Sequence, residues 1–252
     1  MNSSALKYNL DYLNMKNILL QDTDFDISLK LIVNQIESSK KVLEFGPSTG
    51  YFTRFLKEEL NCQVTIIEID PQAAKLAGKY AEKTVVCDIE TLTWYNELQN
   101  EIFDYIIFAD VLEHLKDPWE TLRKASSLLK YDGKIIISIP NIGHNSVMID
   151  LWNNYFRYEE AGILDDTHLR FFGIKNLDDL FHNTGLLRVR TEPVILNYKN
   201  KRFSRIDKDI PLILKLFLNF RKFGNVFQIV ICAQKEQFVL GNNILHSDLL
   251  IK

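Results

Sequence analysis

The segment KVLEFGPSTGYFTRFLKEELNCQVTIIEID, residues 41–70, determines how the rest of the chain is organised. It begins with a short apolar run that ends at Phe45, as expected for a strand buried on both faces. The turn 46–50 supplies two glycines and is followed by apolar residues at helical spacing. A second apolar run, 63–69, ends beside Asp70. This order predicts two parallel strands joined by a right-handed helical crossover.

The same segment predicts a ligand site. Ligands of open α/β sheets bind outside the carboxyl ends of the strands, and glycines allow close approach to the backbone. Glu68 follows Gly50 by 18 residues and ends the second strand, where a carboxylate can accept both hydroxyls of a ribose. The turn has the form Glu44-x-Gly46-x-Ser48-x-Gly50, which does not fit the dinucleotide spacing G-x-G-x-x-G. Glu44 would repel a pyrophosphate but could meet a cationic amino group.

This spacing resembles the first motif of the class I S-adenosylmethionine-dependent methyltransferases, acid-x-Gly-x-Gly-x-Gly, with Ser48 at the middle glycine. The runs DVLEHL (110–115) and GILDDTHLRFF (162–172) are similar to the small-molecule branch of the methyltransferase-domain superfamily. The resemblance covers about residues 40–235. It implies S-adenosyl-L-methionine as the cofactor and S-adenosyl-L-homocysteine as its product. A simpler interpretation of Glu44, a strand-end residue bonded to loop amides, stays open.

The resemblance also implies a set of cofactor contacts. Glu68 would bind the ribose, Asp88 the adenine amino group, and Ile89 would cover the adenine ring. Backbone groups of Ala109 and Asp110 would flank the methionine end. Taken alone, Asp88 would be an ordinary turn residue at the end of a strand. The predicted cofactor-binding residues are Glu44, Gly46, Ser48, Thr49, Gly50, Glu68, Ile69, Asp88, Ile89, Ala109 and Asp110.

Together with the resemblance, the apolar pattern predicts an α/β fold with a Rossmann-like, seven-stranded, mostly parallel sheet. Helices are expected on both faces, and the last strand is expected to be antiparallel. Residues 1–39 are predicted to form an N-terminal helical lead or lid, and 40–252 a methyltransferase domain. Within that domain, the aromatic-rich insertion 141–173 is assigned to the acceptor, and 199–222 is a basic amphipathic segment. Beyond residue 70, strands are expected at 84–87, 103–109, 134–140, 186–196 and 226–233.

Three histidines are candidates for catalysis. Methyl transfer is an in-line displacement at the methyl carbon of a sulfonium, and a hydroxyl acceptor needs a base of suitable pKa. His144, directly after the fifth strand, is expected to be best placed. The other candidates are His114, which could instead shape the cofactor pocket, and His168, which could instead stabilise the insertion. No metal site is assigned because strict ligand spacing is absent, but metal use stays open, since Asp110, Glu113, His114 and Asp165 could contribute ligands.

The chain is therefore predicted to methylate a small molecule of the sugar, quinone or natural-product type, at a hydroxyl oxygen. Two alternatives remain: a nicotinamide-dependent oxidoreductase, disfavoured by the glycine spacing, and a non-catalytic protein that keeps the cofactor-binding fold. No N/D-P-P-Y/F motif follows the fourth strand, which disfavours methylation of nucleic-acid bases.

Charge and composition limit the partners. A net charge of −3 gives no general attraction to nucleic acid. The chain shows neither a secretory pattern nor an apolar run of membrane-spanning length, so a cytoplasmic protein is expected. The segment 199–222 holds eight Lys or Arg against two Asp around an apolar run. Such a segment can lie on an anionic membrane surface, pack against the sheet, or pair two copies in a homodimer.

Overall fold

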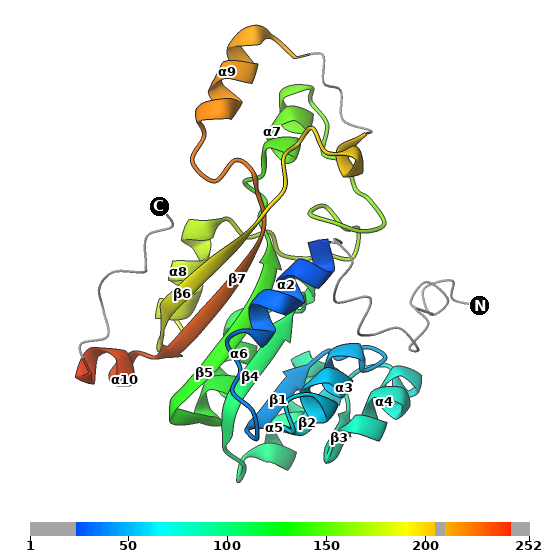
Figure 1. Cartoon of the computed structure of the whole chain (residues 1–252), viewed down its shortest axis with the longest axis vertical. Coiled ribbons are helices and arrows are strands. Elements are labelled where there is room, and N and C mark those ends of the chain that lie inside the picture. Colours follow the sequence, from blue (N-terminus) through cyan, green and yellow to red (C-terminus); the bar gives the residue numbers. More distant parts are fainter. Residues whose placement is uncertain (1–23, 205–209, 243–252) are drawn as a thin grey trace.

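The computed structural model describes residues 24–204 and 210–242, in which seven strands form one sheet flanked by helices (Figure 1). The predicted α/β fold is confirmed. The strands are β1 (Lys41–Phe45), β2 (Gln63–Glu68), β3 (Lys83–Val86), β4 (Phe103–Ala109), β5 (Leu129–Pro140), β6 (Leu186–Ile195) and β7 (Val226–Lys235). The α-helices are α2 (Asp24–Val33), α3 (Tyr51–Glu58), α4 (Pro71–Ala77), α5 (Thr93–Leu98), α6 (Pro118–Ser127), α7 (Asn145–Trp152), α8 (Ile174–His182), α9 (Leu212–Phe220) and α10 (Glu236–Gly241).

The strand order is β3-β2-β1-β4-β5-β7-β6. Strands β1 to β5 pair in parallel, and β7 runs antiparallel to both β5 and β6, as predicted for the last strand. The chain moves outward from β1 to β3 and then returns to β4 on the other side of β1. The carboxyl ends of β1 and β4 therefore form the topological switch point, where open α/β sheets bind their ligands.

Strand β1 is buried on both faces because its residues alternate between two cores. Leu43 and Phe45 belong to one hydrophobic cluster, and Val42 belongs to the cluster on the opposite face. Phe45 stacks on Phe108 of β4, with ring centroids 4.3 Å apart. Helices cover both faces of the sheet (Figure 1), and the apolar side chains of β1 are buried between the two helical layers.

The N-terminal lead is described only from residue 24. Helix α2 ends at Val33, within the predicted helical lead 1–39, and packs Leu29 and Ile32 into the core. A role for residues 1–23 as a lid lies outside the described residues. No described helix is long and apolar enough to cross a membrane.

A third hydrophobic cluster lies beyond the carboxyl end of β5, where α7 and α9 extend past the sheet (Figure 1). Leu214 and Leu218 of α9 are buried there. Residues on another part of the helix surface stay exposed, including Leu212, Ile213 and Phe220. The basic segment is thus partly a packed helix, and one face of it is open.

Candidate active site

The turn after β1 is shaped by backbone conformation. Gly46, Ser48 and Gly50 have φ values of 64°, 51° and 85°, in the left-handed region that favours glycine. A Cβ on Gly50 would lie 2.4 Å from the Cα of Ala77, so the turn is pressed against α4. A Cβ on Gly46 would lie 2.9 Å from the Val111 side chain. The two glycines therefore allow the turn to pack between α4 and the loop after β4.

Glu68 connects the end of β2 to this turn. Its Oε2 accepts a hydrogen bond from the Ser48 amide at 2.9 Å, and its Oε1 accepts from the amides of Ile69 at 2.9 Å and Asp70 at 3.0 Å. Burial raises the pKa of the Glu68 carboxyl, and the three amide hydrogen bonds oppose that shift. The carboxylate is therefore held in one orientation at the carboxyl edge of the sheet. Asp70 caps α4 through the Gln72 amide, as its place before Pro71 suggests.

Glu44, only 2% exposed, is the deepest acid near the turn. Its Oε2 accepts a hydrogen bond from the Thr53 hydroxyl at 2.7 Å. The pKa of Glu44 is raised to about 8, mainly by burial; the Thr53 hydrogen bond opposes this increase, and the charge of Glu68 adds to it. A cationic group close to Glu44 would favour its ionised form. The two carboxylates are hydrogen-bond acceptors that suit a ligand with donor groups such as ribose hydroxyls and an ammonium group.

The residues after β3 lie at the same edge. Asp88 is exposed, and its Oδ1 accepts a hydrogen bond from the Glu90 amide at 2.8 Å, which caps the 3-10 turn η3 (Ile89–Thr91). Ile89 is buried, whereas Ile69 after β2 is 62% exposed. The cap agrees with the simpler interpretation of Asp88. Its predicted contact with adenine stays a prediction.

The residues after β4 are held by the neighbouring strands. Asp110 has a φ of 54°, and its Oδ1 accepts hydrogen bonds from Gln228 Nε2 at 2.6 Å and Ser138 Oγ at 3.2 Å. Burial raises the pKa of Asp110, while these two hydrogen bonds lower it. The side chain is thereby directed to β5 and β7. The backbone of Ala109 and Asp110 stays at the switch point beside β1.

His144 has a structural environment. It is fully buried and is the N-cap of α7, where its Nδ1 accepts from the Ser146 amide at 3.1 Å. Its Nε2 donates to the Leu196 carbonyl at 2.6 Å, so both ring nitrogens are engaged. Burial lowers the pKa of His144 to about 4. The position directly after β5, which made His144 the first candidate for a base, also makes it a helix cap. The following Asn-Ser and apolar helix are the signal for that role.

His114 and His168 come together from distant parts of the chain. Their ring centroids are 4.7 Å apart. His114 ends the 3-10 turn η4 (Leu112–His114), and His168 belongs to the insertion after β5. The carbonyl of Glu113 accepts hydrogen bonds from the amides of Leu169 at 2.8 Å and Arg170 at 2.9 Å. These two bonds connect the insertion to the loop after β4. Burial lowers the pKa of His168.

Sequence reasoning named Glu113 only as a residue that could contribute a metal ligand, and gave it no place among the catalytic or cofactor-binding residues. Its side chain is 1% exposed, and neither carboxylate oxygen has a hydrogen-bond partner among the residues that the structure describes. Burial raises the pKa of Glu113 well above its usual range, and the charge of Asp110 adds to this. The signal in the sequence was its position beside His114 in an apolar run. Arg170 has a structural role, because its Nε donates to the Lys116 carbonyl at 2.9 Å and its guanidinium lies over Trp119.

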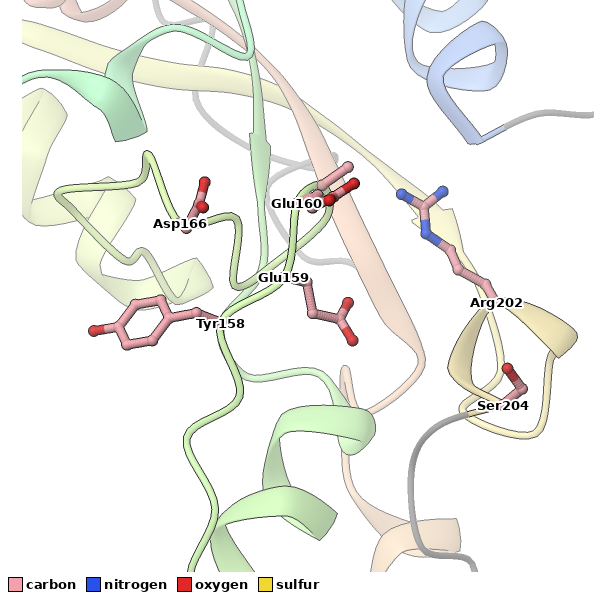
Figure 2. A pocket seen from close by; sticks show the side chains of 7 residues that line it. Tyr158, Glu159, Glu160, Asp166, Arg202 and Ser204 are labelled. Carbon is pink, nitrogen blue, oxygen red and sulfur yellow. The ribbon is translucent and has the colours of Figure 1, made fainter. Parts of the chain in front are cut away.

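The insertion and the basic segment also enclose an open cavity of about 540 Å³. In Figure 2 the loop that carries Glu159 and Asp166 lies opposite the 3-10 turn η5 (Lys201–Phe203), which carries Arg202. None of the predicted cofactor residues lines this cavity. Most of its lining residues belong to the insertion 141–173, which was assigned to the acceptor, and the cavity is separate from the switch point.

Comparisons with known proteins agree with this arrangement. A family model described as a methyltransferase domain matches residues 25–190. An uncharacterized protein of Methanocaldococcus jannaschii is 24% identical over 193 residues, which cover 74% of this chain and 85% of that protein. A ubiquinone biosynthesis O-methyltransferase of Xanthomonas euvesicatoria pv. vesicatoria is 29% identical over 119 residues, 46% of this chain and 49% of that enzyme. The chain thus matches about half the length of that enzyme.

Solved structures show the same fold. An S-adenosylmethionine-dependent methyltransferase from Archaeoglobus fulgidus superposes with a TM-score of 0.59 at 17% identity, over 90% of this chain and 100% of that one. A 1,6-didemethyltoxoflavin-N1-methyltransferase from Burkholderia thailandensis, with bound S-adenosylhomocysteine, gives a TM-score of 0.54 at 17% identity, over 92% and 87% of the two chains. At this identity the likeness concerns the fold alone.

Proposed function

The chain belongs to the methyltransferase-domain family, and from this premise we propose that it transfers the methyl group of S-adenosylmethionine to a hydroxyl oxygen of a small molecule. The observation that carries the proposal is the pairing of His114 and His168, which lies between the loop after β4 and the insertion. A base on the acceptor side is what methylation of a hydroxyl needs. The similarity to ubiquinone biosynthesis O-methyltransferases supports oxygen as the acceptor atom.

The cofactor supplies a methyl group activated by its sulfonium, and the protein supplies position and a dry site. We assign Glu68 to the ribose hydroxyls and Glu44 to the cationic amino group. Burial raises the pKa of Glu44. A cationic group beside it would offset the cost of ionising this buried carboxyl, which supports the assignment. Asp88 and Ile89 are assigned to adenine. The left-handed turn and the backbone of Ala109 and Asp110 complete the contacts.

In the proposed reaction, the histidine pair acts on the acceptor. The hydroxyl proton passes to an imidazole, the oxygen forms a bond to the methyl carbon, and the electrons of the carbon–sulfur bond move to sulfur. The products are a methyl ether and S-adenosylhomocysteine. The lowered pKa of His168 keeps its ring neutral at physiological pH, as a base requires. His144 is not assigned this role, because both of its nitrogens are already engaged.

The acceptor is assigned to the surface formed by the insertion. Its side chains include exposed aromatics that suit the flat face of a sugar, a quinone or a similar ring. Trp152, Tyr155 and Tyr158 are 57%, 58% and 62% exposed. The cavity in Figure 2 adds acidic and basic groups from the same region.

The test is methyl transfer from labelled S-adenosylmethionine to a panel of phenols, sugars and matched amines, analysed by mass spectrometry. We expect methyl ethers from one hydroxyl class. Methylated amines alone would contradict the assignment to oxygen. Binding of S-adenosylhomocysteine without turnover on any acceptor would favour a non-catalytic binding protein. A thermal melt measures that binding, because a native-state ligand at 100 times its Kd adds about 2.7 kcal/mol of stability.

A further inference from the structure

Glu113, His114 and His168 form a cluster that could bind a metal ion as well as supply a histidine base. Each residue offers one ligand atom, and these atoms lie within 4.8 Å of one another. Glu113 and His114 come from η4, and His168 is brought to them by the hydrogen bonds of the next two residues to the Glu113 carbonyl. Two imidazoles and a carboxylate form a ligand set suited to divalent transition metals.

The environment of the Glu113 carboxylate independently favours a bound cation. It is 1% exposed, and neither oxygen has a hydrogen-bond partner in the described part of the chain. A buried carboxylate without donors is unfavourable unless it is neutral or paired with a positive charge. Arg170, whose amide contacts Glu113, directs its own guanidinium to the Lys116 carbonyl.

The two histidines are oriented as metal ligands usually are. The Nδ1 of His168 lies 3.1 Å from the Ile163 carbonyl, and the Nδ1 of His114 lies 3.3 Å from the Thr167 carbonyl. A carbonyl only accepts hydrogen bonds, and the Thr167 hydroxyl, 3.1 Å from the His114 Nδ1, already donates to Asp165. These neighbours favour the tautomers in which Nδ1 carries the proton and Nε2 keeps its lone pair. Metal-bound histidines usually donate their other N–H to a carbonyl or carboxylate in this way. Asp165 supports this arrangement indirectly: it accepts a hydrogen bond from the amide of Thr167 at 2.9 Å, and the carbonyl of Thr167 faces His114.

We propose that Glu113, His114 and His168 bind one divalent metal ion of the zinc, manganese or iron class. Metal–ligand distances of about 2.0–2.2 Å in a tetrahedral site require ligand atoms 4.8 Å apart to approach one another by about 1.2–1.5 Å. Three protein ligands leave an open position for an oxygen ligand. In that position the ion would lower the pKa of an acceptor hydroxyl, so that its proton leaves to solvent before the oxygen attacks the methyl carbon. With the ion bound, the two imidazoles are ligands and do not take the proton themselves. This role rests on the proposed methylation of oxygen, whereas binding of the ion does not.

The test is calorimetric titration of the full chain, freed of metal by a chelator, with Zn²⁺, Mn²⁺ and Mg²⁺. The Co²⁺ absorption spectrum reports the ligand geometry. We expect one Zn²⁺ or Mn²⁺ per chain and much weaker Mg²⁺ binding. Loss of an outer-shell partner of a metal ligand costs about 10–100-fold in affinity, so His168→Asn and Glu113→Gln should each cost about 100-fold or more. His182→Asn, which removes an exposed histidine on α8, is the matched control and should bind normally.

A melt with S-adenosylhomocysteine shows that each variant is folded. The proposal is overturned if the wild type binds no stoichiometric ion, if His168→Asn binds as tightly as the wild type, or if His182→Asn loses as much affinity. Methyl transfer to a hydroxyl that persists in the chelated enzyme would remove the metal from the reaction and keep the proposed function. Metal binding without methylation of any hydroxyl would keep the site and remove that function.

Discussion

The turn after β1 and the insertion after β5 both contribute to the carboxyl edge of the sheet, but their polar groups are fixed by different means. At the turn, Glu68 is held by the amides of Ser48, Ile69 and Asp70, all within one strand–helix–strand unit. At the insertion, His168 meets His114 across more than fifty residues of chain. The arrangement around Glu68 is local, because its donors are backbone amides of one short segment. The second exists only when the whole fold has formed.

The largest expected effect tests whether the turn depends on backbone shape. Gly50→Ala places a methyl group 2.4 Å from the Ala77 Cα, in a left-handed conformation with φ 85°. Left-handed strain and overpacking together should lower the free energy of unfolding by about 2–5 kcal/mol. Chemical denaturation measures the loss. Gly185→Ala is the matched control, because Gly185 has φ 72° with nothing within 4 Å, so it isolates the conformational part. Equal losses at both positions would contradict close packing of the turn on α4.

The same difference explains what the sequence could predict. The positions of the strands along the chain and the glycine turn follow from apolar runs and turn residues, whose effects are local. The order of the strands in the sheet comes from the structure. The expected strand 134–140 begins at Leu129 in the structure, because β5 continues back through residues 129–133 beside β4. Helix α2 ends at Val33, six residues before the predicted end of the helical lead at residue 39. These are errors of boundary, and the sheet is unaffected.

The candidate site was predictable only where its contacts are local. His144 was chosen for its position after a strand, but its burial and its bond to the Leu196 carbonyl depend on residues about fifty positions away. Glu113 gave no sign of being buried without a partner, because its environment is completed by the insertion. A single sequence carries no pairing rule for such long-range contacts.

A second prediction concerns the buried charge beneath the turn. The folded-state pKa of Glu44, about 8, lies above its unfolded value of about 4.3, so the fold favours the neutral form. Its contribution to stability is complete below the unfolded pKa and is lost as the pH rises toward 8. Glu44→Gln does not titrate there and can still accept from Thr53. The ligand-free variant should therefore gain stability relative to the wild type by roughly 2–4 kcal/mol between pH 5 and 8.

Denaturant melts at several pH values measure this gain. Glu59→Gln is the control, because Glu59 is exposed on the helix end that follows the same turn. Its stability difference from the wild type should stay flat with pH. A flat difference for Glu44→Gln as well would show that the acid is paired or hydrated, and would remove it as the partner of a cationic ligand.

The smallest expected effect tests the cofactor side directly. Glu68→Ala removes the acceptor for three amides and the proposed partner of the ribose. Hydrogen bonds to a charged group contribute about 1.5–3 kcal/mol, so the Kd of S-adenosylhomocysteine should rise roughly 10- to 150-fold. Calorimetry measures the affinity. Asp70→Ala is the matched control, because it removes a neighbouring acid and a helix cap and should lower stability by about 0.5–2 kcal/mol without weakening binding. If both variants bind equally well, Glu68 only fastens the turn to β2, and the ribose must be held elsewhere. If both lose affinity, the turn itself is what the cofactor recognises, and its shape matters more than the carboxylate.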